Sequence, residues 1–473
     1  MGQHALLRAA AAVVRRSFLC FLACLALFLA LPQRVPHSMD THFFVVWLEQ
    51  GHQEYPRHPL YMQLARFMYQ ILLLPGARPY TALLVLSAVS AAAGLAFASA
   101  AAKRLVGFAQ SEVLLPLGLV CVPSLFYFAT AAEIGGVASG ASGLAWWSFA
   151  RFGERRTYSA AVILGLCTGL SAGVHAFGHL LLPMFVIAAT VLRLAPSGAR
   201  LVPLVLAATT HGLVAVLVAV VSGVGARGQA VDAWQHLLER FDTLDLSKTA
   251  IVFWREWLLS YAPWSLIAIV GLFAKRSRAF ALITLLFVVL HLPLSVLLLG
   301  SIGADEDGMY FLSLAVPAVV TALQLLAGRT LFAAMILGAL LSVALAKPHW
   351  PQPGSVGFCE GLQTLRTEGN FVLVATTKER DAARSRVAEV VILELDRLLG
   401  FYLLAQREGK TPKQWFSELM TKQDMPILFT KEAAAILSNY GPPFEGLWSL
   451  VERDYSVEPV QRIDFYGFFI RPH

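Results

Sequence analysis

Long apolar runs are the feature that most constrains how this chain folds. A stretch of roughly 17–25 apolar residues matches the ~30 Å of hydrocarbon in a lipid bilayer. About eleven such runs can be placed, at 16–33, 80–102, 110–130, 135–151, 157–174, 177–193, 201–223, 259–274, 279–300, 309–327 and 329–347. Only 14% of the residues are charged, against about 25% in soluble proteins. The sequence therefore predicts a polytopic α-helical membrane protein with about eleven transmembrane helices.

The basic residues between these runs alternate in a regular way. One set of loops carries 14 of the 22 in residues 1–346, and the opposite loops carry eight: the 14 are Arg8, Arg15, Arg16, Lys103, Arg104, Arg151, Arg155, Arg156, Arg193, Arg200, Lys275, Arg276, Arg278 and Arg329. The same loops hold only two acids, Glu112 and Glu154. Because Lys and Arg concentrate in cytoplasmic loops, we expect a cytoplasmic N-terminus and external loops at 34–79 and 224–258. The expected location is the inner membrane of a bacterium.

A composition change near residue 348 predicts a second domain. Residues 1–347 form the expected membrane domain, and 348–473 begin with the Pro/Gly-rich KPHWPQPGS and carry nearly balanced charges. The runs NFVLVATT, MPILFT and RIDFYGFFIRPH are typical of strands, and a long helix is expected from Lys378 to about Gln406. Alternating strands and helices indicate a small extracytoplasmic α/β domain. It lacks a G-x-G-x-x-G or P-loop pattern, and its neutrality argues against a nucleic-acid partner.

The segment HPLYMQLARFMYQILLLPG, which starts at His58, has two possible interpretations. As a transmembrane span it would place Lys103 and Arg104 outside and invert every later loop. As an amphipathic helix on the outer membrane surface, with Arg66 on its polar face, it keeps the charge alternation consistent. We therefore expect an interfacial helix.

Neither the first apolar run nor the cysteines give a clear signal for signal-peptide cleavage or for metal binding. RRSFLCFLACLALFLALPQ resembles a secretory signal but lacks a clean cleavage site, so a retained anchor is expected, with cleavage left open. Four of the five cysteines lie in apolar runs, and no metal-ligand spacing is present. We expect no cofactor, and a divalent cation stays an open alternative.

Polar residues gather at the predicted outer ends of the apolar runs. Because ionisable groups inside a bilayer are costly, such residues usually have a task. Five separate loops contribute to this surface, with Asp40, His42, Arg57 and His58 in the first, then Glu133, His175, Arg240 with Arg255, and Asp305 with Asp307. This convergence is how an active site at a membrane surface would be assembled.

Each of these residues also has a structural interpretation. Asp305 and Asp307 can simply be solvated, and single histidines within a run, such as His211 and His291, are usually packed and hydrogen-bonded. Arginines such as Arg57 and Arg66 can bind phosphate or reach toward lipid headgroups. Trp146 and Trp147, at the end of a run, are expected in the interfacial aromatic belt.

Three blocks in the first part of the chain resemble the GT-C superfamily of integral-membrane glycosyltransferases, and most closely its protein O-mannosyltransferase-like group. Asp40 followed by HPLYMQLARF is similar to the first external loop, with its D-S-G-E and H-P-P-G-Y-P-L-Y patterns. PSLFYFATAAEIGG places Glu133 on the family glutamate, and GLCTGLSAGVH places His175 on the family histidine. The resemblance covers roughly residues 15–195. D-S-G-E is D-T-H-F here, so the second acid of that pair is absent.

The resemblance implies transfer of a sugar from a polyprenyl-phosphate-linked donor to a glycan, lipid or protein acceptor on the extracytoplasmic face. Asp40 would be the general base of an inverting displacement, and Glu133 would share that role or orient the acceptor. The arginines would give the phosphate fixed positive charge, and the lipid bilayer is an expected partner. The expected substrate-binding residues are His42, Arg57, His58, Tyr61, Arg66, His175, Arg240, Arg255, Asp305 and Asp307. The alternative is a transporter or lipid flippase, although such proteins place polar groups near the midplane and often show internal repeats.

The Asp40→Asn variant tests the assignment of the base. The amide keeps the size of the side chain but cannot accept the acceptor's proton, so sugar transfer from a lipid-linked donor is expected to fall about 10²–10⁴-fold. The measurement is transfer of labelled sugar by membranes holding equal amounts of folded protein. Undiminished transfer would show that Asp40 is not the base.

Overall fold

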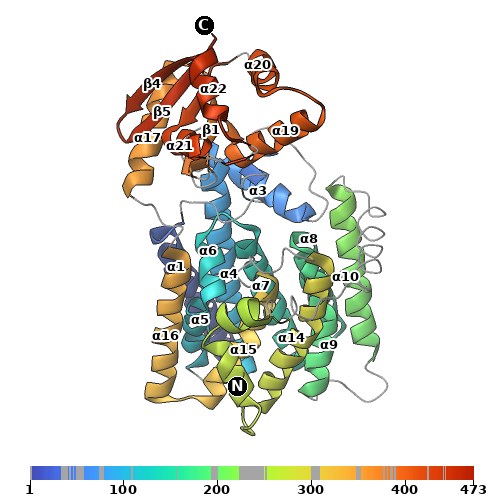
Figure 1. Ribbon diagram of the computed structural model, residues 1–473. Helices are drawn as coiled ribbons and strands as arrows, with labels where there is room; N and C mark the ends of the chain where they lie inside the picture. The colour runs from blue at the N-terminus through green and yellow to red at the C-terminus, as the bar shows by residue number, and fades with distance from the viewer. Residues whose placement is uncertain are drawn as a thin grey trace. The chain divides into compact units, whose positions relative to one another are not determined.

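The computed structural model forms two compact units, a helical unit (residues 1–33 and 43–348) and a unit made chiefly of residues 349–473 (Figure 1). The residues it describes are 3–33, 41, 44–45, 47–48, 58–73, 79–107, 110–155, 157–192, 201–222, 250, 253–299, 309–347, 353–376, 379–380, 382–383, 387, 390–422, 425–439, 441–442 and 444–472.

Helices occupy the apolar runs of the first unit. In chain order they are α1 (Gln3–Ala30), α3 (Pro59–Leu73), α4 (Pro79–Val106), α5 (Ser111–Val120), α6 (Pro123–Thr130), α7 (Ile134–Arg155), α8 (Tyr158–Val174), η1 (Ala176–Leu180), α9 (Leu181–Val191), α10 (Leu201–Val221), η3 (Phe253–Leu259), α13 (Trp264–Gly271), α14 (Arg278–Leu299), η5 (Met309–Leu314), α15 (Ala315–Leu325) and α16 (Gly328–Ala346). The class of polytopic helical protein follows from this unit.

The expected number of eleven spans is not confirmed. Within the described part of the chain, three helices are long and apolar enough to cross a membrane: α4, residues Val202–Val221 of α10, and α16. Helices α5 and α6 add a fourth if they count as one span, bent by 74°. Pro123 explains this break, because proline lacks the N–H that would continue the hydrogen bonding of the preceding turn. Other apolar runs are likewise divided, as where η1 precedes α9.

The α3 helix is 15 residues long, about 22 Å at 1.5 Å per residue, and so is too short to span a bilayer. Figure 1 shows it crossing one end of the helical unit. Tyr61, Met62 and Ala65 are buried against the bundle, whereas Phe67 and Ile71 are 61% and 48% exposed. A helix with one face on the protein and exposed apolar groups on another suits a membrane interface, as the charge alternation predicts.

Helices α4 and α7 make the closest helix contact described in this unit. A Cβ atom added at Gly143 would lie 2.3 Å from the Gly94 carbonyl oxygen, and one added at Gly140 would lie 2.4 Å from the Ser90 carbonyl oxygen. Small residues are needed at such a crossing because larger side chains would force the two backbones apart. Gly140 faces Ser90 and Gly143 faces Gly94, so the residue numbers of the contacting pairs increase in the same direction along both helices. Helices α4 and α7 therefore run parallel.

Trp146 and Trp147 lie on different sides of α7. The Trp146 side chain is fully buried, and its Nε1 donates a hydrogen bond to the Ser313 carbonyl oxygen at 2.9 Å. The prediction of an interfacial position is therefore wrong for Trp146. Adjacent helix residues point about 100° apart, so Trp147 faces a different surface, toward Phe97 of α4.

The second unit is built on a five-stranded sheet of order β2-β1-β3-β5-β4. Its elements are α17 (Pro353–Glu368), β1 (Val372–Ala375), β2 (Val391–Glu394), α19 (Leu395–Arg407), α20 (Pro412–Lys422), β3 (Ile427–Thr430), α21 (Lys431–Asn439), α22 (Leu447–Asp454), β4 (Ser456–Arg462) and β5 (Phe465–Arg471). Strand β1 pairs in parallel with β2 and β3, and β5 pairs antiparallel with β3 and β4. The expected α/β class matches this sheet with its helices.

The expected long helix from Lys378 to Gln406 is wrong, because β2 lies within it. Val391, Ile392 and Leu393 pair with β1, and α19 begins only at Leu395. A short apolar run of this kind is compatible with either a helix or a buried strand, and the neighbouring strand decides between them.

The carboxyl ends of β1 and β3 meet at a partly buried acid, Glu379. Glu379 Oε2 accepts hydrogen bonds from the Thr376 N–H at 3.1 Å and from the hydroxyls of Thr376 and Thr430 at 3.0 and 2.5 Å. Burial raises the pKa of the Glu379 carboxyl, and these hydrogen bonds oppose that shift. The side chain thus supplies an internal acceptor at the sheet edge where α/β domains commonly bind ligands.

The Gly143→Ala variant tests the α4–α7 contact. The added methyl group would overlap the Gly94 backbone, so the free energy of unfolding is expected to fall by about 1–3 kcal/mol or more. The thermal midpoint of the purified protein in detergent, which is the measurement, should fall accordingly. Gly212→Ala is the matched control, since a Cβ atom there meets nothing within 4 Å. Equal midpoints for the two variants would contradict the packing described.

Candidate active site

Half of the predicted site residues can be placed in the structure. Glu133, His58, Tyr61, Arg66, His175 and Arg255 lie in the helical unit. The other six lie outside the described residues: Asp40, His42, Arg57, Arg240, Asp305 and Asp307.

Glu133 lies in the bend 131–133 between α6 and α7 and is only 3% exposed. Its Oε2 accepts a hydrogen bond from the Ile134 N–H at 3.3 Å, at the start of α7, and its carbonyl accepts one from the Ser87 hydroxyl of α4 at 2.7 Å. A carboxylate is stabilised at a helix N-terminus because the helix dipole is positive there. The acid is thus held in place by both helices of the close α4–α7 pair.

Gln33 ties the end of α1 to the same region. Its Nε2 donates to the Tyr127 carbonyl at 2.8 Å and to the Thr130 hydroxyl at 3.0 Å, and its N–H donates to the Thr130 carbonyl at 2.8 Å. Tyr80 of α4 donates its hydroxyl to the Gln33 carbonyl at 3.1 Å. Gln33 therefore fixes the point from which the chain continues toward Asp40, a role that the sequence analysis missed.

His58 and His175 come from distant parts of the chain and meet face to face. Their ring centroids are 4.6 Å apart with an angle of 20° between the planes, and both side chains are 7% exposed. His58 directly precedes α3, and His175 joins α8 to η1. The structure therefore brings together two of the residues that the sequence predicts for substrate binding.

The orientation of the His175 ring is set by a backbone N–H two residues further along the chain. Its Nδ1 accepts a hydrogen bond from the Phe177 N–H at 3.2 Å. In a neutral ring with Nδ1 as acceptor, Nε2 carries the proton and acts as a donor. His175 is thus an oriented hydrogen-bond donor at the end of α8.

The stacked rings continue toward α14. Phe177 lies 5.5 Å from His175 and 6.0 Å from His291, measured between ring centroids. His291 is 1% exposed, and its Nδ1 lies 3.0 Å from the Phe287 carbonyl oxygen. This geometry agrees with the interpretation of His291 as a packed, hydrogen-bonded histidine, and it connects α14 to the His58–His175 pair.

Tyr61, Arg66 and Arg255 occupy three different environments. Tyr61 is fully buried, and its ring meets Phe44 edge to face at 4.8 Å between centroids. Arg66 is half-buried on α3, and Arg255 is exposed on η3. Of these, the two arginines are the ones with surface available to a ligand.

Glu256 is a buried acid that the sequence analysis did not select. It lies on η3, a π-helical turn, and its side chain is fully buried beside Trp257. The Ser260 N–H closes this turn by donating to the Arg255 carbonyl at 3.2 Å. Buried acids and π-helical turns are both frequent at functional sites, so Glu256 joins the candidates. Glu256 was not selected from the sequence because it lies between Trp254 and Trp257 in an aromatic stretch.

The fold matches those of solved membrane glycosyltransferases. ArnT from Cupriavidus metallidurans bound to undecaprenyl phosphate is 14% identical, with a TM-score of 0.58 over 98% of this chain and 97% of that one. The oligosaccharyltransferase AglB from Archaeoglobus fulgidus, in complex with an inhibitory peptide and a dolichol-phosphate, is 12% identical, with a TM-score of 0.52 over 96% and 74%. No protein-family model and no curated protein sequence matches this chain.

The chain therefore shares its fold with ArnT and AglB, with a helical unit followed by a smaller unit containing a sheet. The structural similarity between this chain and ArnT extends over nearly the full length of both chains, so it includes both units. This shared fold agrees with the expected helical protein with a C-terminal α/β domain, and the mannosyltransferase-like group is not confirmed.

A double-mutant cycle tests the contact between His58 and His175. An aromatic pair of this kind contributes about 0.5–1.5 kcal/mol beyond its burial, so His58→Ala and His175→Ala should lower stability by less together than the sum of their separate effects. The readout is the thermal midpoint in detergent. His211→Ala supplies the control, because His211 instead contacts His179 at 3.2 Å. It should combine additively with His58→Ala, and additive effects in both pairs would argue against the stack.

Proposed function

We propose that this protein transfers a sugar from a polyprenyl-phosphate-linked donor to an acceptor on the extracytoplasmic side of the membrane. The observation that carries the proposal is the fold shared with ArnT over 98% of the chain, in a structure bound to undecaprenyl phosphate. The buried acid and the paired histidines at one end of the helical unit support it. The sugar is unspecified, and the acceptor is a glycan, a lipid or a protein.

The reaction needs one proton acceptor and stabilisation of one leaving group. The acceptor oxygen forms a bond to the anomeric carbon as the bond from that carbon to the phosphate oxygen breaks. The acceptor's proton passes to a carboxylate, and the lipid phosphate departs with the bonding electrons. A single displacement of this kind inverts the anomeric centre. Its transition state is favoured by a nearby base and by fixed positive charge.

We assign the proton acceptor to Asp40, which follows α1 shortly after the anchored Gln33. Gln33 is tied to Tyr127 and Thr130 just before the bend that holds Glu133. We assign to Glu133 a share of the base function or the orientation of the acceptor hydroxyl.

The lipid phosphate requires donors and cations, for which arginine is well suited because its guanidinium binds phosphate through two hydrogen bonds. Arg66 and Arg255 are accessible on α3 and η3, and Arg57 and Arg240 complete the proposed set. His175 contributes an oriented Nε2 donor to the phosphate or the sugar, and His58 supports that ring through their stacking.

Glu133→Gln tests this mechanism in reconstituted vesicles. Transfer of labelled sugar from a polyprenyl-phosphate donor is expected to fall about 10²–10⁴-fold, since the amide cannot take up a proton. Glu154→Gln is the matched control. Glu154 lies near the other end of α7 in an exposed pair with Arg104, so its loss should leave transfer unchanged.

The same vesicles separate an enzyme from a transporter or flippase. An enzyme forms labelled acceptor and free polyprenyl phosphate, whereas a flippase moves the intact lipid between leaflets without forming either product. Movement of intact donor with no product, in the wild-type protein, would contradict the proposed function.

A further inference from the structure

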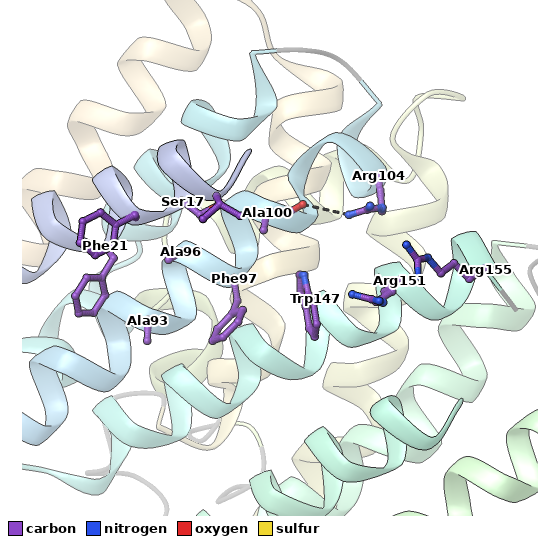
Figure 2. A pocket seen from close by; sticks show the side chains of 12 residues that line it. Ser17, Phe21, Ala93, Ala96, Phe97, Ala100, Arg104, Trp147, Arg151 and Arg155 are labelled. Carbon is purple, nitrogen blue, oxygen red and sulfur yellow. Dashed lines mark hydrogen bonds between the residues drawn. The ribbon is translucent and has the colours of Figure 1, made fainter. Parts of the chain in front are cut away.

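An apolar groove of about 540 Å³ lies among α1, α4 and α7 (Figure 2). Phe18 and Phe21 line it from α1, Ala96 and Ala100 from α4, and Trp147 from α7. Its volume falls in the range of about 300–1,000 Å³ that is usual for sites binding small molecules. The groove is thus large enough for part of a lipid, and it does not include any residue of the candidate active site.

Three arginines, Arg104, Arg151 and Arg155, gather at one end of this groove (Figure 2). Arg104 Nε pairs with Glu154 at 2.6 Å, and the Arg104 side chain remains 39% exposed. The Arg151 guanidinium lies 5.5 Å from the centre of the Trp147 ring, so a cation–π contact holds it at the groove. Three cations against one carboxylate leave an excess of positive charge beside an apolar surface.

The arginines lie far from the proposed chemistry. Helix α7 has 22 residues, which at 1.5 Å per residue makes it about 33 Å long. Glu133 directly precedes its first residue, and Arg155 is its last. Helix α4, which is long and apolar enough to cross a membrane, runs parallel to α7 and contacts both of its ends, through Ser87 at the Glu133 carbonyl and Arg104 at Glu154, so the two ends lie toward opposite membrane surfaces. A donor lipid reacting near Glu133 cannot have its phosphate at this groove.

We propose that the groove binds an anionic phospholipid from the membrane leaflet at the arginine end of α7. The lipid phosphodiester would be held by Arg104, Arg151 and Arg155, and an acyl chain would lie along Phe18, Phe21 and the small residues of α4. Guanidinium groups suit a phosphodiester, and an added ammonium group in a zwitterionic headgroup would be repelled by them. Because the lipid contacts α1, α4 and α7 together, its binding stabilises the folded bundle.

Thermal unfolding of the full-length, delipidated protein in detergent tests this site. Phosphatidylglycerol is expected to raise the midpoint in a saturable manner, and neither phosphatidylcholine nor inorganic phosphate should do so. In the double variant Arg151→Gln/Arg155→Gln the apparent affinity for phosphatidylglycerol should fall by about thirtyfold. Ala96→Phe keeps the arginines but fills the groove, so it should also remove the stabilisation.

The double variant Lys275→Gln/Arg276→Gln is the matched control. It removes the same charge from exposed positions between α13 and α14, and the affinity for phosphatidylglycerol should stay unchanged. Equal stabilisation by phosphatidylcholine, or an equal loss in this control, would overturn the proposal. Tighter binding of undecaprenyl phosphate that depends on Arg151 and Arg155 would overturn it too, by assigning the groove to the polyprenyl carrier. None of these outcomes depends on sugar transfer.

Discussion

The close contact between α4 and α7 determines where the functional groups of the helical unit lie. Lipid tails are as apolar as most side chains, so helices in a membrane associate through packing and hydrogen bonds rather than through hydrophobic burial. Gly94 and Gly143 let the two backbones touch. At one end of this pair the Ser87 hydroxyl holds the Glu133 carbonyl, and at the other Arg104 pairs with Glu154. The packed pair of α4 and α7 therefore positions both the candidate active site and the apolar groove that has Arg104, Arg151 and Arg155 at one end.

Buried polar groups in the helical unit are costly unless they serve a purpose. Glu133, Glu256 and the stacked pair His58 and His175 are each less than 9% exposed, in a unit otherwise dominated by apolar residues. Burying such groups without compensation costs several kcal/mol, so helix ends, backbone groups and neighbouring rings hold them in place. The proposed sugar transfer would give these buried groups such a purpose, because charge develops during that reaction.

Hydropathy predicts segments better than it predicts their connections. The positions of α4, α10 and α16 follow directly from their apolar runs, and the family resemblance predicted a fold of the kind that the chain shares with ArnT. The break at Pro123 was not predicted, because hydropathy does not register the missing proline N–H. The strand β2 was not predicted, because it depends on pairing with β1. Trp146 was misplaced for a related reason: hydropathy does not tell which side of a helix faces other helices, and its neighbour Trp147 lies on a different side.

Composition and charge alternation by themselves determine that this chain belongs in a membrane and that its C-terminal part is a different kind of domain, and short motifs in the sequence, through the family resemblance, select Asp40, Glu133 and His175 as candidates. These conclusions follow from local quantities, namely the hydrophobicity of segments and the sign of the charge that each loop carries. Only the tertiary structure placed His58 against His175, buried Glu256 and collected Arg104, Arg151 and Arg155 at one groove. Such contacts depend on which helix faces pack together, and that is decided by shape over the whole bundle.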